Sequence, residues 1–340
     1  MRWKFLRWVP VLWLGLAGTG CGGWVAHRLV QAPNTYPTWF APKARVTLDF
    51  GAAMLTNFPT RFADVGAPAA RLCYRIVEPA NYHFRTTSTN WVEGQQPHFR
   101  FSFEGTVPGE RLANSRRPRG TVVLLHGYGL EHAVMLPWAL RLAEEGWRCV
   151  LVDLRGHGRS TGRRIYFGVQ ESRDLSALLD ELTRGDGLAG SVAVLGESYG
   201  AALALRWKAE EPRVGAVVAL APYAELSAAA LNIRREYASW FPRSCLEAGL
   251  RELPSLLKVA PGELDTTAPL RRSPVTALFV AGEEDKIAGV ADVERLHALG
   301  APKSRWLVVP HATHEALLYF FDDLVGPVVG WLNENGVVEE

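Results

Sequence analysis

From Gly120 onward the chain alternates short, almost continuously apolar runs with helix-forming stretches, and this pattern constrains the fold more than any other feature. The apolar runs are Val122–Leu125, Cys149–Val152, Val192–Leu195, Val214–Leu220, Val275–Val280 and Trp306–Val309. The first helices are expected around Val134–Glu145, Glu171–Leu182 and Tyr199–Glu210. Strands that are apolar at nearly every position suit a sheet buried on both faces. The pattern therefore predicts an α/β fold with a mostly parallel central sheet flanked by helices.

The alternation is interrupted between Tyr223 and Ser273, where the chain contains no good strand candidate. Apolar residues in this insert have helix-like spacing, and they are Leu226, Leu231, Ile233, Tyr237, Trp240 and Phe241. An ordinary pair of crossover helices is one interpretation, but the insert is long for a simple connection. We predict that residues 223–273 form a helical cap over the carboxyl ends of the strands. Trp240, Phe241 and the leucines would either form the core of this cap or contact an acyl substrate.

Residues with catalytic potential follow the apolar runs, at the points where the predicted strands end. His126-Gly127-Tyr128-Gly129 follows the first run and Asp153 the second. Ser198 follows the third run, an acidic cluster follows Val275–Val280, and two histidines follow Trp306–Val309. Ligands of open parallel sheets bind outside the carboxyl ends of the strands. We therefore expect a hydroxyl, a carboxylate and an imidazole at one edge of the sheet.

Ser198 lies in the sequence Gly196-Glu197-Ser198-Tyr199-Gly200, between an apolar run and an alanine-rich helix former. A tight strand-to-helix turn needs glycine at 196, where a side chain would crowd the serine backbone, and at 200, where helix and strand approach closely. A serine hydroxyl is a weak nucleophile at neutral pH, so a base must accept its proton. Backbone N–H groups of Tyr199 and Tyr128 are the predicted oxyanion-hole donors.

The residues alone leave the base and the acid open. His311 and His314 are both candidates for the imidazole, and an imidazole suits the task because its pKa of about 6.5 lies near neutral pH. Candidates for the carboxylate that orients it are Glu283, Glu284, Asp285 and Asp153. Three further polar residues lie near the predicted site without a catalytic assignment: His126, His157 and Glu197.

The ordered motifs "HGYG", "DLRGHGRS", "GESYG", "GEEDKI" and "HATHE" resemble those of α/β-hydrolases, and the resemblance extends from about Thr121 to Trp331. "DLRGHGRS" followed by "FGVQESRDL" is most similar to the monoacylglycerol-lipase or serine-aminopeptidase-like branch. The resemblance implies Ser198 as nucleophile, His314 as base and Asp285 as the acid. It also implies a structural role for Asp153, and it says little about the substrate.

Composition excludes some classes of partner. The 340 residues carry a formal net charge of +2, so there is no electrostatic basis for a nucleic-acid partner. The four cysteines, Cys21, Cys73, Cys149 and Cys245, form no C-x-x-C pair and no zinc spacing. We expect neither a metal nor an organic cofactor.

The N-terminus combines positive charge with an apolar segment. Arg2, Lys4 and Arg7 precede an uncharged stretch from Trp8 to Ala26. We expect residues 1–30 to be an uncleaved signal anchor, a lipoprotein signal with Cys21 as the lipidated residue, or a plain secretory signal. Each alternative places the catalytic domain outside the cytoplasm, in a bacterial periplasm or at the cell surface.

The remaining chain is expected to contain a linker at 31–44, marked by prolines, and a hydrolase domain at 45–340. Residues 45–118 are rich in strand formers and contain no strong helix candidate, and we expect them to add antiparallel edge strands to the main sheet. The predicted function is hydrolysis of an acyl bond, preferably a carboxylic ester, through an acyl-enzyme. Peptidase, thioesterase and other α/β-hydrolase chemistry are alternatives, as is a non-catalytic binding protein with the same fold.

Overall fold

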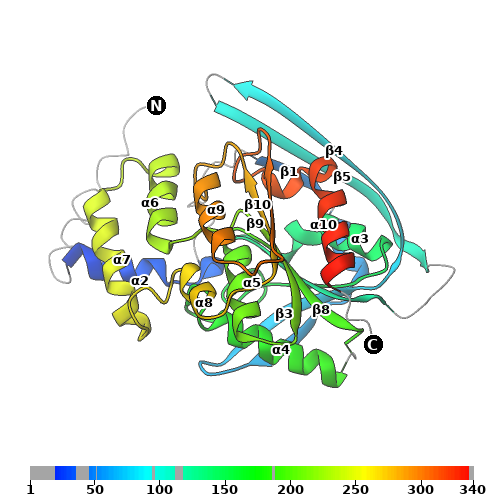
Figure 1. Ribbon diagram of the computed structural model, residues 1–340, viewed down its shortest axis with the longest axis horizontal. Helices are drawn as coiled ribbons and strands as arrows, with labels where there is room; N and C mark the ends of the chain where they lie inside the picture. The colour runs from blue at the N-terminus through cyan, green and yellow to red at the C-terminus, as the bar shows by residue number, and fades with distance from the viewer. Residues whose placement is uncertain are drawn as a thin grey trace, which may run out of the picture.

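An eight-stranded sheet forms the centre of the molecule in the computed structural model, in the order β11-β10-β9-β8-β6-β7-β3-β2 (Figure 1). The structure describes residues 20–35, 46–50, 52–93, 96–111, 118–185 and 188–336. Six strands run parallel: β6 (Gly120–Leu125), β7 (Arg148–Val152), β8 (Ser191–Glu197), β9 (Val214–Leu220), β10 (Ala277–Gly282) and β11 (Arg305–Val309). The antiparallel strands β3 (Ala70–Val77) and β2 (Arg61–Val65) complete one edge. Both β6 and β10 are buried at every position, which explains their uninterrupted apolar sequence.

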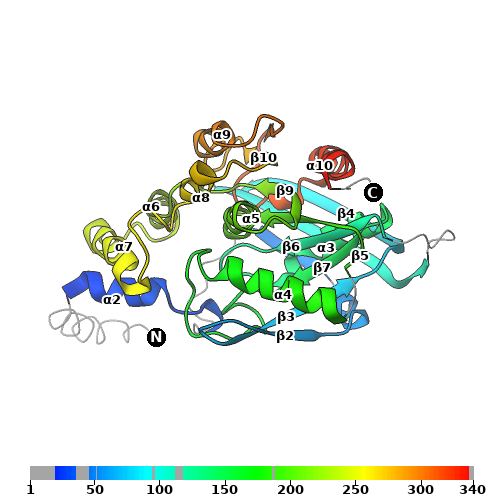
Figure 2. The same cartoon turned by 60° about the horizontal axis from the view of Figure 1, so that its bottom comes forward.

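Helices cover the sheet as the alternating sequence predicts (Figures 1 and 2). They are α3 (Leu136–Glu144), α4 (Glu171–Gly185), α5 (Tyr199–Glu210), α9 (Val290–Ala298) and α10 (Phe321–Asn335). Trp138 of α3 packs on Phe321 of α10 with ring centres 4.7 Å apart, and Trp207 of α5 donates to the Ser176 hydroxyl of α4. The first helix is shorter than predicted because residues 132–135 form a separate 3-10 turn. Pro137 then occupies the first turn of α3, where its missing N–H is not needed.

The strand-rich segment before residue 118 contributes to two different sheets. Strands β2 and β3 extend the main sheet, as expected for edge strands. A separate sheet is formed by β1 (Val46–Phe50), β5 (Gln96–Arg111) and β4 (Ala80–Glu93), with β4 and β5 making a long hairpin (Figure 1). Phe101 of β5 packs on Tyr319 and Phe321, with ring centres 4.8 and 5.6 Å apart. The second sheet therefore supports the segment that links the last strand to α10.

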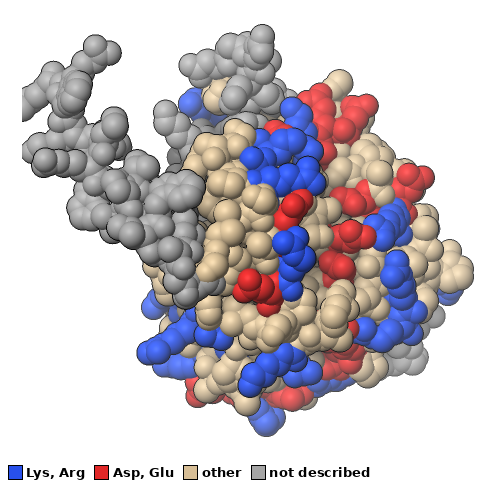
Figure 3. Space-filling view, turned by 90° about the vertical axis from the view of Figure 1, so that its left-hand side faces the viewer, with Lys and Arg blue, Asp and Glu red and all other residues tan. Residues whose placement is uncertain are grey.

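The insert between β9 and β10 is helical, as predicted. It contains α6 (Leu226–Tyr237), α7 (Arg243–Leu257) and α8 (Thr267–Arg272). Leucines of α7 supply buried contacts, whereas Trp240 is 77% exposed and so is not part of a cap core. Basic and acidic side chains alternate over the face of the molecule that carries these helices (Figure 3). Ion pairs such as Arg243–Glu247 at 2.7 Å account for part of this pattern.

The helix α2 (Gly20–Leu29) precedes the hydrolase core and lies beside α7 (Figures 1 and 2). Val25 and Ala26 are buried, and a Cβ added at Gly249 of α7 would collide with Val25. The last part of the stretch predicted to enter a membrane, residues 20–26, is thus packed against protein. The rest of that stretch, residues 8–19, lies outside the described residues. No helix in the described part of the chain is long and apolar enough to span a membrane.

The first residues of the predicted linker pack on the turn after β7. Ala32 is fully buried, and the backbone N–H of Asn34 donates to the carbonyl of Gly156 at 3.0 Å. The Asn34 side chain also donates to the carbonyls of Gly158 and Ser160. Residues 36–45 of the linker lie outside the described residues.

Candidate active site

Ser198 occupies a strained turn between β8 and α5. Its φ of 51° and ψ of −111° lie in a region that residues with a side chain rarely adopt. Both neighbouring glycines are required by space: a Cβ at Gly196 would collide with the carbonyl of Gly200, and a Cβ at Gly200 would collide with the carbonyls of Leu125 and His126. The Ser198 N–H donates to the carbonyl of Leu220 in β9 at 2.8 Å and anchors the turn to the sheet. This geometry presents the hydroxyl at the carboxyl edge of the sheet.

Three side chains from three strand ends meet in one chain of hydrogen bonds. The Ser198 hydroxyl lies 2.8 Å from His314 Nε2, and His314 Nδ1 lies 2.7 Å from Asp285 Oδ2. The second oxygen, Asp285 Oδ1, accepts the backbone N–H groups of Ile287 and Ala288 at 2.7 and 2.8 Å. Because Asp285 accepts at Nδ1, the imidazole carries its proton there and leaves Nε2 free to accept the serine proton. The arrangement can deprotonate a serine hydroxyl.

The electrostatics of His314 suit a general base. Burial alone would lower the pKa of His314, but the Asp285 carboxylate outweighs it and holds the pKa above the ordinary histidine value. A base of this kind accepts a proton readily and is stabilised as an imidazolium by the carboxylate behind it.

The predicted oxyanion donors lie on the same edge. Tyr199 is the first residue of α5, so its N–H belongs to the donor-rich end of the helix. Tyr128 lies three residues beyond the end of β6, and its ring contacts that of Tyr199 edge-on at 6.2 Å. The oxyanion role of both N–H groups stays a prediction.

His126 and His157 are part of the turns around the site. Leu154 N–H donates to His126 Nε2 at 3.1 Å, and His126 Nδ1 donates to the Gly127 carbonyl, so both ring nitrogens are engaged. Burial lowers the pKa of His126 to about 3 and that of His157 to about 4. Both rings are therefore neutral near pH 7 and shape the loop between β6 and Tyr128.

The other candidates for base and acid lie apart from the serine. His311 is exposed and contacts Glu284 at 3.3 Å, and Glu283 accepts the backbone N–H of His311. These residues form a surface turn. The structure brings His314 and Asp285 to the serine instead.

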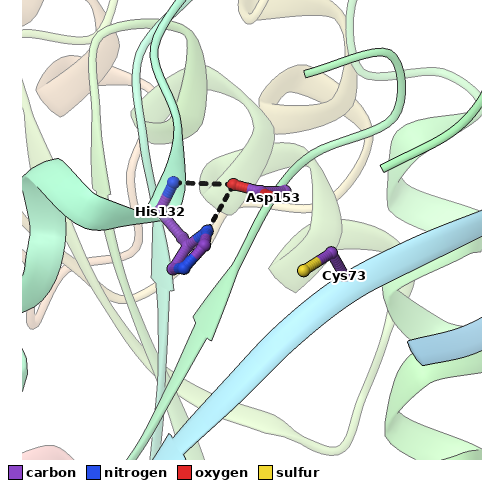
Figure 4. Close-up of side chains that lie close together, drawn as sticks. All are labelled: Cys73, His132 and Asp153. Atoms are coloured by element: carbon purple, nitrogen blue, oxygen red, sulfur yellow. Dashed lines mark hydrogen bonds and ion pairs between the residues drawn. The ribbon is translucent and has the colours of Figure 1, made fainter. Parts of the chain in front are cut away.

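Asp153 has a complete set of local partners (Figure 4). Its Oδ1 accepts both the backbone N–H and the ring Nδ1–H of His132, at 2.8 and 2.6 Å, and its Oδ2 accepts the backbone N–H of Arg159. Burial alone would raise the pKa of this carboxyl, but the bonds from His132 outweigh it and hold the pKa below its usual value. Asp153 thus fixes the turn after β7, the structural role that the family resemblance implies.

Cys73, His132 and Asp153 also present three metal-ligating atoms within 4.8 Å of one another (Figure 4). Their chemistry does not suit a metal ion. Arg75 Nε donates to His132 Nε2 at 3.0 Å, which engages the remaining ring nitrogen and places a guanidinium beside the cluster. Burial raises the pKa of the Cys73 thiol to about 12, so the thiol of the cluster is protonated near pH 7. The cluster is a buried hydrogen-bonded support of the fold. The sequence offered no signal for His132, which lies in a short 3-10 turn.

The sheet order, the strained serine turn and the helical insert after β9 define the class of this protein. They are the features of an α/β-hydrolase fold. Residues 116–268 match the family model described as "Serine aminopeptidase, S33".

Individual known proteins are similar over parts of the chain. A monoacylglycerol lipase of Mycolicibacterium smegmatis is 36% identical over 102 residues, which is 28% of this chain and 34% of the lipase. The uncharacterized protein YqkD of Bacillus subtilis is 27% identical over 56% of this chain and 63% of its own length. The chain thus spans less than two thirds of the length of these relatives. Among solved structures, the Pyrococcus furiosus esterase Pf2001 has a TM-score of 0.59 at 18% identity, covering 87% of this chain and all of the esterase, a likeness of fold.

Proposed function

We propose that this protein is a serine hydrolase that cleaves a carboxylic ester. The observation that carries the proposal is the hydrogen-bond chain from Ser198 through His314 to Asp285 at a strained serine turn. Disfavoured backbone conformations cluster at active sites, so the φ of Ser198 supports a nucleophilic role when it is combined with the contact to His314. The similarity to a monoacylglycerol lipase and to an esterase fold supports an ester as the substrate.

The proposed reaction has two halves. Ser198 Oγ attacks the acyl carbonyl carbon while His314 Nε2 accepts the serine proton, and the carbonyl oxygen becomes an oxyanion facing the N–H groups of Tyr128 and Tyr199. The oxyanion collapses, the bond to the leaving alcohol breaks, and His314 passes its proton to that alcohol. Water then attacks the acyl-enzyme with His314 again as base, and the carboxylic acid leaves with Ser198 restored. Asp285 stabilises the imidazolium in both halves.

A substrate panel tests the proposal. Purified protein should hydrolyse p-nitrophenyl esters, and a series from acetate to long acyl chains should locate its preference. Ser198→Ala is the matched control and should abolish turnover. Cleavage of aminoacyl amides without ester turnover would replace the proposal by the peptidase alternative that the family description suggests. Turnover of acyl thioesters alone would favour a thioesterase.

We also propose that the segment before α2 tethers the enzyme to a membrane or directs its export. Arg2, Lys4 and Arg7 followed by an apolar stretch support this proposal. Mass spectrometry of the mature N-terminus separates the alternatives. Diacylglyceryl on Cys21 means a lipoprotein, an intact Met1 in the membrane fraction means an anchor, and a new N-terminus without lipid means a plain secretory signal. An intact Met1 in the soluble cytoplasmic fraction would contradict the proposal.

A further inference from the structure

Glu197 is a buried carboxyl group beside the nucleophile that the proposed mechanism does not use. The residue is 6% exposed, and Glu197 Oε2 has no hydrogen-bond partner among the described residues. Burial raises the pKa of this carboxyl to about 7. A buried, incompletely bonded carboxyl group is costly to keep, so its position calls for an explanation.

The Glu197 carboxyl packs directly on Gly127. A Cβ added at Gly127 would collide with Glu197 Oε2, and the three atoms nearest to it would all belong to the Glu197 carboxyl group. The backbone of Gly127 is not in the left-handed region, so a side chain at this position would be opposed by the Glu197 carboxyl group, which it would have to displace, rather than by φ. Gly127 leads directly to Tyr128, a predicted oxyanion donor. The carboxyl group therefore sets how closely the oxyanion loop approaches the serine turn.

Glu197 also faces the catalytic histidine. The titratable groups that act on its carboxyl are His314, Asp285 and Glu315, and it acts in turn on Tyr319. A negative charge on Glu197 favours the protonated form of His314, together with Asp285.

We propose that Glu197 is a positioning residue of the active site, which holds the Gly127–Tyr128 loop against the serine turn and stands as a second acidic group behind His314. The proposal rests on the proposed function, because it assigns a role in the same reaction. The residue before the nucleophile would then influence both the oxyanion loop and the base.

The first test is the pH profile of kcat/KM for Glu197→Gln, which keeps the shape of the side chain and removes its charge. With a pKa of about 7, Glu197 is charged only toward the upper end of the acidic limb. Without that charge the proton affinity of His314 falls there, so the limb should move to lower pH by about a few tenths of a unit. Glu171→Gln is the matched control. Glu171 is equally buried and its pKa is also raised to about 7, but its carboxylate accepts the N–H groups of Tyr166 and Gly168 at the start of α4. The control should leave the acidic limb in place, and an unmoved limb in Glu197→Gln would overturn the proposal.

The second test is a double-mutant cycle between Gly127→Ala and Glu197→Ala, with thermal melting to establish that each variant folds. Gly127→Ala should lower kcat about ten- to a hundredfold, somewhat less than removal of an oxyanion donor. Removing the Glu197 carboxyl should relieve the collision, so the double variant should be more active than the product of the single effects predicts. Additive effects would contradict the packing role. Ester hydrolysis that survives in Ser198→Ala would overturn the proposed function as well. Hydrolysis that depends on Ser198 would overturn only the role of Glu197 if the two substitutions act additively and the acidic limb of the pH profile does not move in Glu197→Gln.

Discussion

The molecule contains two histidine–aspartate pairs with nearly the same hydrogen bond and different consequences. His314 Nδ1 lies 2.7 Å from Asp285, and His132 Nδ1 lies 2.6 Å from Asp153. The difference is at the other ring nitrogen. Nε2 of His314 meets the Ser198 hydroxyl, whereas Nε2 of His132 accepts a hydrogen bond from the Arg75 guanidinium. A histidine–carboxylate pair can act as a base only where its free lone pair meets a proton that can move.

The two histidine–aspartate pairs also differ in how far they are buried. The His132 and Asp153 side chains are 3% and 0% exposed, and they join the loop after β6 to the turn after β7. The His314 side chain is 13% exposed and lies at the carboxyl edge of the sheet, in contact with the Ser198 hydroxyl. One pair therefore holds the fold together, and the other is available for chemistry.

Removing the two histidines should separate these roles most strongly. His314→Ala should lower kcat by on the order of 10⁴- to 10⁶-fold, because His314 Nε2 is the base that contacts the Ser198 hydroxyl. His132→Ala should instead lower the free energy of unfolding by about 3–5 kcal/mol, because Asp153 would remain as a buried charge. Ester turnover and urea unfolding of both variants measure the two effects. If His314→Ala and His132→Ala lost the same activity and had the same stability, the assignment of one histidine to catalysis and the other to the fold would be contradicted.

Replacing the aspartates sharpens the comparison. Asp285→Asn should keep the fold and lower kcat by on the order of 10⁴-fold, because the amide can favour the wrong histidine tautomer. Asp153→Asn should leave kcat per folded molecule within about tenfold and lower stability by about 1–3 kcal/mol, because the amide nitrogen cannot accept. Steady-state kinetics and thermal melting distinguish the variants. If Asp153→Asn lost more activity than Asp285→Asn, Asp153 rather than Asp285 would be the carboxylate that supports catalysis.

The pH profile tests the electrostatics of the proposed catalytic pair, His314 and Asp285. Asp285 holds the pKa of His314 above the ordinary value of about 6.5, and only neutral His314 can accept the serine proton. Activity should therefore rise with pH and reach half its plateau above pH 6.5. Measurement of kcat/KM between pH 5 and 9 for a soluble ester gives this midpoint. A midpoint below 6.5 would show that burial outweighs the carboxylate.

The smallest effect is expected at His311, the other candidate for the general base in the sequence after β11. Its side chain is 80% exposed and it contacts only surface carboxylates among the described residues. His311→Ala should change kcat/KM less than about twofold and stability by less than about 0.5 kcal/mol. The same ester assay and melting curve measure this. A large loss of activity would return His311 to the catalytic site.

The parts of the site that could be predicted from sequence are those that follow from backbone geometry. Gly196 and Gly200 are needed because backbone atoms approach them, so their spacing around Ser198 identifies the turn. Asp285 and His314 follow strands of one parallel sheet, so the strand pattern places them at one edge. The choice of His314 over His311 needed the family resemblance, since both follow β11 within five residues.

Features that depend on contacts between distant segments could not be predicted. His132 lies in a short turn, and nothing near it in the sequence indicates Asp153 or Arg75 as its partners. Alternation predicts strands in residues 45–118 but not their partners, so the separate sheet of β1, β4 and β5 was missed. An apolar helix has the same sequence whether it faces lipid or protein, which is why the packing of α2 on α7 was not foreseen.

The most direct test of the account is labelling with a fluorophosphonate probe, with the modified residue identified by mass spectrometry. Wild-type protein should be labelled at Ser198, and His132→Ala should still be labelled at temperatures where it is folded. Ser198→Ala should not be labelled, and His314→Ala should be labelled far more slowly than wild type. Well-folded wild-type protein that does not react, or reacts at another residue, would contradict the claim that Ser198 and His314 form the catalytic pair.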